Sequence, residues 1–155
     1  MAASTYFLEC VKRMANVHKD FHGALSYAFE FLESNYGEDG LRDFLDRLGD
    51  TVYKPLVLDL KARGLPALED HWRRIMDLEG GEYTLRMDGD TLVLDLRACP
   101  AVHHMRAHDY RVSEHFCEHT RIVNEAICRR AGYQATVEYD QDKGRCVQRF
   151  RKADA

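Results

Sequence analysis

The sequence predicts an α+β fold in which N-terminal helices pack on a four-stranded antiparallel sheet. Up to about residue 80, apolar residues recur every three or four positions, which is the period of an amphipathic helix. Beyond residue 81 they alternate with polar residues in two pairs of short segments, and one long helical pattern separates the two pairs. The expected order is therefore helices followed by β-β-α-β-β, with the helices on one face of the sheet.

Residues that start or stop helices divide the helical half, residues 1–80. Gly37 is a suitable stop, because glycine adopts the left-handed backbone that ends many helices. Pro55 is expected to kink or end a helix, whereas Pro66 suits a first helical position. Phe21 and Val52 are both expected on buried apolar stripes. The segments expected to be helical are 5–14, 17–36, 39–54, 56–63 and 66–79.

The second half, residues 81–152, is expected to form two hairpins around one helix. Tyr83, Leu85 and Met87 alternate with polar residues, and Asp88-Gly89-Asp90 supplies a hairpin turn. The helix is expected over 113–131, and the second hairpin joins 133–139 to 145–151. A single domain of 155 residues accommodates both halves.

Composition excludes several classes of protein. Hydrophobic residues make up 45% and charged residues 31%, which is typical of a folded domain. The 22 basic and 26 acidic residues give a net charge of −4, so we expect no nucleic-acid partner. No apolar run is long enough to cross a membrane, and the first residues do not resemble a signal peptide. Five cysteines, an odd number, favour free thiols in a reducing cytoplasm.

Cysteine and histidine concentrate in one segment. Seven of the thirteen such residues lie within 21 positions: Cys99, His103, His104, His108, His115, Cys117 and His119. Their spacing does not match a zinc finger, so a structural zinc site is only weakly indicated. Outside this segment, His18 and His22 lie one helical turn apart, where they are either metal or substrate ligands or two solvated histidines.

The cysteines allow more than one role. Cys117 lies near the expected start of a helix, where a thiol is a nucleophile of lowered pKa or else a small core residue. Cys10 and Cys128 are expected in the core, and Cys146 is expected to face either the site or the sheet. His22 lies beside an apolar stripe, so we expect it to face the same pocket as Cys99 and Cys117.

Four short motifs resemble the bacterial family of L-2-amino-thiazoline-4-carboxylic acid hydrolases. In chain order they are Asp20-Phe21-His22-Gly23, Cys99-Pro100-Ala101, Phe116-Cys117-Glu118-His119-Thr120 with Asn124, and Gly144-Arg145-Cys146. The resemblance extends over residues 15–150. It implies a hydrolase that opens a C–N bond in a small cyclic amidine.

The resemblance also implies roles for individual residues. Cys117 would be the nucleophile, with His22 and His119 carrying protons. The substrate would be bound by Arg106, Arg121 and Asn124. The cofactor stays open: in the alternative mechanism a divalent metal such as zinc activates water, with ligands Cys99, Cys117 and His119.

The order of elements also resembles the 4-vinyl-reductase-like and haem–nitric-oxide-binding groups. That analogy concerns the fold alone, and fold does not determine function. It gives a second hypothesis, a non-catalytic sensor module that binds a metal, haem or another small molecule. The expected partners are a small-molecule substrate and, in a homodimer, a second copy of the chain.

Overall fold

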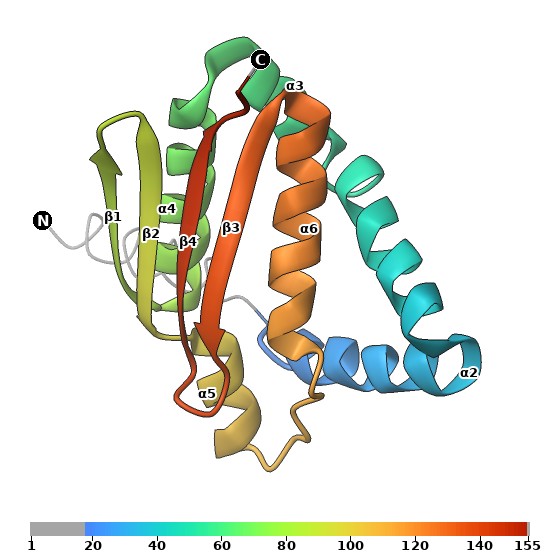
Figure 1. Cartoon of the computed structure of the whole chain (residues 1–155). Coiled ribbons are helices and arrows are strands. Elements are labelled where there is room, and N and C mark those ends of the chain that lie inside the picture. The colour runs from blue at the N-terminus through green and yellow to red at the C-terminus, as the bar shows by residue number, and fades with distance from the viewer. Residues whose placement is uncertain (1–17, 155) are drawn as a thin grey trace, which may run out of the picture.

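A computed structural model describes residues 18–154, which form a four-stranded antiparallel sheet with helices on one side (Figure 1). Three helices come first: α2 (Phe21–Asp50), α3 (Lys54–Arg63) and α4 (Leu65–Glu79). They are followed by β1 (Glu82–Asp88), β2 (Thr91–Ala98), α5 (Pro100–Ala107), α6 (Phe116–Ala131), β3 (Tyr133–Asp140) and β4 (Arg145–Lys152). The predicted α+β class is confirmed. The expected helix over 5–14 and its Cys10 lie outside the described residues.

The sheet has the order β1-β2-β4-β3, and each neighbouring pair is antiparallel. Strand β2 pairs with β4 so that Leu94 lies opposite Gln148 and Leu96 opposite Cys146. Opposed residues point to the same face of a sheet. Cys146 and Gln148 therefore share the helix-covered face with the buried leucines of β2.

Several boundaries differ from the prediction. Helix α5 occupies a stretch expected to be loop, because Pro100 starts a helix there instead of only ending a strand. Helix α6 begins at Phe116, since Ser113 uses its carbonyl and hydroxyl oxygens to accept backbone N–H groups beyond it. Phe21 and Val52 are 46% and 66% exposed, so their placement on buried stripes was wrong. Phe21 is the first residue of α2, and Val52 lies in the turn that follows α2, so both are beyond the part of the helix that packs on the core.

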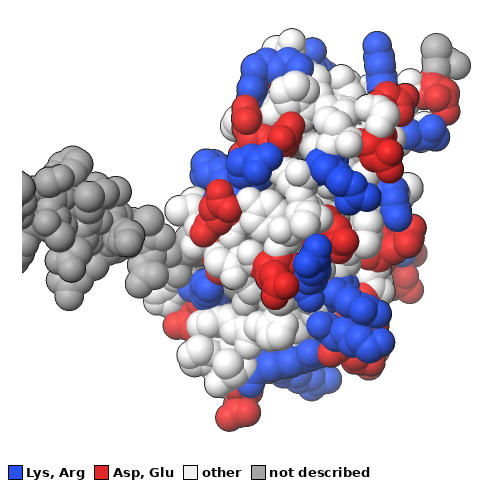
Figure 2. Space-filling model, turned by 90° about the vertical axis from the view of Figure 1, so that its left-hand side faces the viewer, with Lys and Arg blue, Asp and Glu red and all other residues white. Residues whose placement is uncertain are grey.

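Helix α2 bends at Gly37, whose φ of 73° is not helical. The predicted stop is thus a kink between two helical halves. The second half packs against α6, and Phe29 in the first half and Leu45 in the second are fully buried. A helix able to cross a membrane does not occur within residues 18–154. On the face shown in Figure 2, acidic and basic side chains lie interspersed.

The loop between α5 and α6 runs along the first half of α2. The Ser26 hydroxyl donates to the Arg111 carbonyl at 2.8 Å and accepts the Ser113 N–H at 2.8 Å. Tyr110 packs on Gly23, where an added Cβ would come within 2.6 Å of the tyrosine ring. These contacts fix the start of α2 and, with it, His22.

Candidate functional site

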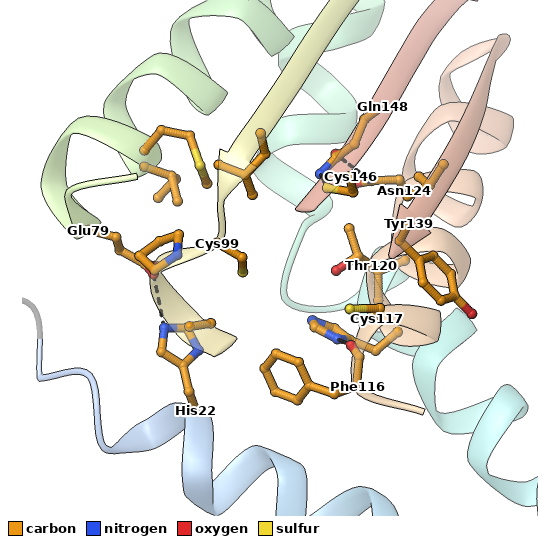
Figure 3. A pocket seen from close by; sticks show the side chains of 18 of the residues that line it. His22, Glu79, Cys99, Phe116, Cys117, Thr120, Asn124, Tyr139, Cys146 and Gln148 are labelled. Atoms are coloured by element: carbon orange, nitrogen blue, oxygen red, sulfur yellow. Dashed lines mark hydrogen bonds and ion pairs between the residues drawn. The ribbon is translucent and has the colours of Figure 1, made fainter. Parts of the chain in front are cut away.

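A cavity of about 200 Å³ lies between the helix-covered face of the sheet and helices α2, α4 and α6 (Figure 3). Its walls are mainly apolar, with Leu25 from α2, Ile75 and Met76 from α4, and Val123 from α6. The few polar side chains come from separate elements that meet only in the folded chain. An apolar cavity with a small number of placed polar groups is typical of a ligand site.

A histidine–glutamate pair closes one end of the cavity. The Nε2 atom of His22 lies 2.9 Å from a carboxylate oxygen of Glu79, and both side chains are about nine-tenths buried. Lys19 donates to the Glu79 backbone carbonyl at 2.6 Å. The pair joins the start of α2 to the end of α4, because His22 lies in the first turn of one helix and Glu79 is the last residue of the other.

Three thiols surround the same part of the cavity: Cys99, Cys117 and Cys146 (Figure 3). Burial, together with the smaller effects of the neighbouring Cys99 and Cys146, raises the pKa of Cys117 to about 12. Burial likewise raises the pKa of Cys146 to about 11 and that of Cys99 above its usual value. At neutral pH these groups are therefore thiols rather than thiolates, and the predicted lowering of the Cys117 pKa is wrong.

The three sulfur atoms differ in their surroundings. Cys146 Sγ accepts a hydrogen bond from Gln148 at 3.3 Å. Cys99 precedes α5, where the backbone N–H groups of Val102 and Ala101 partly offset the rise in its pKa. The Cys117 sulfur has no hydrogen-bond partner within the described part of the chain, although its backbone N–H donates to Gln141. Cys117 thus offers the least engaged thiol in the cavity.

His119 is held as a neutral aromatic side chain. Its Nδ1 atom donates to the Phe116 carbonyl, and the ring lies 5.1 Å from the rings of both Phe29 and Phe116. Burial lowers the pKa of His119 to about 4, so the ring carries no charge at neutral pH.

The structure brings five of the predicted site residues to one cavity: His22, Cys99, Cys117, His119 and Asn124. It does not bring the two predicted arginines there. Arg106 donates to the backbone carbonyls of Gln141 and Asp142, in the turn between β3 and β4.

Arg121 points along its own helix instead. It pairs with Glu118 and Glu125, which lie three and four residues away on α6.

Two other histidines of the segment that follows Cys99 bind acidic residues of α2 or of its N-cap and do not line the cavity. His104 bonds Asp20 at 2.9 Å, and His115 bonds Glu33 at 2.9 Å. His18, the predicted partner of His22, is exposed. Among residues 18–154, no three histidine, cysteine or acidic side chains are arranged to hold a metal ion. The predicted metal site on Cys99, Cys117 and His119 is therefore wrong.

Sequence reasoning missed Glu79, Trp72 and Gln148. Glu79 and Trp72 lie on α4, far along the chain from the histidine- and cysteine-rich segment, and no motif marks them. The position of Gln148 could have been recognised from the sequence. It lies two residues from both Cys146 and Phe150, and every second residue of a strand points to the same face of the sheet.

No family model and no curated protein matches this sequence. Among solved structures, it is similar to trafficking protein particle complex subunit 3 from Naegleria fowleri, determined covalently bound to palmitic acid. The similarity has a TM-score of 0.53 at 9% sequence identity, and it covers 88% of this chain and 98% of the other. The two chains share a fold.

This likeness corrects the functional predictions. The expected hydrolase is contradicted, because the solved structure that shares this fold is described as a trafficking-complex subunit and not as a hydrolase. The alternative of a sensor module for a metal, haem or small molecule does not match it either.

Proposed function

We propose that this chain carries a long-chain acyl group inside its core, as a thioester on Cys117, and acts as a subunit among other proteins. The observation that carries the proposal is the apolar cavity with an unengaged thiol facing it. The related trafficking-complex subunit, which has the same fold, is described as covalently bound to palmitic acid. In this proposal the acyl chain is a permanent part of the core and takes part in no turnover.

The burial of an acyl chain in the cavity is favoured by the hydrophobic effect. Each methylene removed from water contributes about 0.8 kcal/mol. The chain would lie against Leu25, Ile75, Met76 and Val123, which line the cavity. Filling the cavity therefore stabilises the packing of α2, α4 and α6 on the sheet.

Attachment requires an activated acyl donor such as a coenzyme A thioester. The Cys117 sulfur attacks the carbonyl carbon and loses its proton, and the donor thiolate leaves and takes up a proton. One thioester is broken and one is formed, so no oxidant or reductant is needed. Cys117 is favoured over Cys99 and Cys146 because its sulfur has no hydrogen bond to give up within residues 18–154.

Intact-mass spectrometry of the full chain tests this assignment. After incubation with a long-chain acyl-coenzyme A, we expect a mass increase of one acyl group that neutral hydroxylamine removes. Cys117→Ser should lose the modification, whereas Cys99→Ser and Cys146→Ser, which alter thiols of the same cavity, should keep it. An unmodified wild-type chain, or modification that persists in Cys117→Ser, would overturn the proposal.

The rate of attachment should rise steeply with pH. With the pKa of Cys117 at about 12, the thiolate fraction grows about tenfold per pH unit throughout the range from about 7 to 9.5. A small thiol of ordinary pKa, near 8.5, should instead level off within this range. Mass spectrometry over time at each pH gives the rates, and a plateau for the protein below pH 9 would contradict the prediction.

A further inference from the structure

One edge of the sheet has no neighbour within residues 18–154. Strand β1 pairs with β2 on one side, so on its other side backbone N–H and C=O groups point away from the sheet. At the opposite edge α6 packs on β3 and lies beside that strand (Figure 1). In the described part of the chain, β1 is therefore the edge at which another strand can pair.

The side chains of β1 divide between the two faces of the sheet. Tyr83 and Leu85 pair with buried leucines of β2, so they lie on the helix-covered face. Because alternate residues of a strand point to opposite faces, Glu82, Thr84 and Arg86 lie on the outer face. Glu82 and Arg86 are exposed, and neither forms an ion pair with another residue of 18–154. The open edge thus presents one acidic and one basic side chain on the same face.

Two copies of β1 can pair as antiparallel strands related by a two-fold axis. Opposed residues must share a face, so the longest overlaps are centred on Thr84, Leu85 or Arg86. Centring on Leu85 opposes Glu82 to Asp88 of the other copy, and centring on Arg86 opposes two arginines. Both registers place like charges together, which is destabilising. Centring on Thr84 instead opposes Glu82 of each copy to Arg86 of the other, so it is the register in which opposite charges meet.

We propose that β1 is a dimerisation edge, at which two copies of this chain pair in the register centred on Thr84 and join their sheets into one. Two Glu82–Arg86 pairs flank the two-fold axis on the outer face. On the helix-covered face, Tyr83 of each copy meets Leu85 of the other, and such aromatic–aliphatic cross-strand pairs are stabilising. The two-fold axis closes the assembly at a dimer. This inference does not depend on the acyl-carrying function.

Sedimentation velocity of the full chain tests the dimer. A single pair of edge strands makes a small interface, so we expect reversible association between about 5 and 500 µM. Glu82→Arg and Arg86→Glu each turn both attractive pairs into repulsive ones, and each should raise the dimer Kd about tenfold or more. Lys61→Glu is the matched control, because it reverses one exposed charge on α3 and should leave the Kd unchanged.

Exchanging the two charges tests the register. The double variant Glu82→Arg with Arg86→Glu restores both attractive pairs, so its Kd should return to within about twofold of the wild type. An equimolar mixture of the two single variants should form a mixed dimer, because each charge then meets its opposite on the other copy. Circular dichroism checks that every variant is folded.

Three outcomes would overturn the proposal. The first is a wild-type chain that stays monomeric over the whole concentration range. The second is a dimer that both single variants retain, because the interface would then lie elsewhere on the chain. The third is a loss of the dimer in the single variants that neither the double variant nor the mixture restores, because the charges at these two positions would then not face each other.

Discussion

Replacing His22 with alanine is expected to destabilise the fold by about 3 kcal/mol, because it breaks a buried pair and leaves the partner charge without compensation. His22 and Glu79 are both about nine-tenths buried, and 2.9 Å separates their bonded atoms. The His22 ring also packs against Phe21 and Phe116, with centroids 3.9 and 6.3 Å away. Urea unfolding followed by Trp72 fluorescence measures the loss.

Two further variants make this prediction specific. His18→Ala removes an exposed histidine four residues earlier, and its stability should stay within about 0.5 kcal/mol of the wild type. The double variant His22→Leu with Glu79→Leu should recover most of the loss, because an apolar replacement leaves no charge to solvate. A His22→Ala protein as stable as the wild type would show that the pair does not hold α2 to α4.

The sheet and most helices could be predicted because their signals are local. Apolar and polar residues alternate along β1 and, except at Val93, along β2, and the hairpin that joins the two strands at Asp88-Gly89-Asp90 is present. Helix α5 was missed because it is only eight residues long. Its buried Val102 and Met105 are spaced as in a helix, but two residues are too few to establish a helical period. The exposure of Val52 likewise depends on where the neighbouring helices end. The apolar pattern of a single helix gives no information about those ends.

Only part of the candidate site could be predicted from the sequence. The short motifs and helix spacing placed His22, Cys99 and Cys117 at one pocket, and these three residues do line one cavity. The partner of His22, Glu79, lies 57 residues away in a helix with no unusual composition. A pairing of that kind depends on the tertiary fold, and a single sequence carries no trace of it.

The chemistry was harder to predict than the geometry. A thiol near a helix start suggested a nucleophile of lowered pKa, but burial raises the pKa of Cys117 to about 12. His119 was expected to carry protons, yet burial between two phenylalanine rings lowers its pKa to about 4. In both cases desolvation decides the protonation state, and its extent depends on elements from other parts of the chain.

Gly49→Ala is expected to destabilise the protein by about 2 kcal/mol through overpacking where α2 crosses α6. An added Cβ would lie 2.7 Å from the Ala126 Cβ and 3.3 Å from the Ile127 backbone nitrogen. Backbone atoms cannot rotate away as a flexible side chain does, so the helices must separate. Alanine improves helix propensity by at most about 1 kcal/mol, which is too little to change the sign.

The double variant Gly49→Ala with Ala126→Gly isolates the cause. It removes the nearer contact atom, so the two changes together should cost less than the sum of the single changes, as measured by urea unfolding. Because α6 also carries Cys117, Thr120 and Asn124 into the cavity, a displaced α6 should lower acyl uptake in Gly49→Ala as well. A Gly49→Ala protein that unfolds at a higher urea concentration than the wild type would show that the crossing has room for a methyl group.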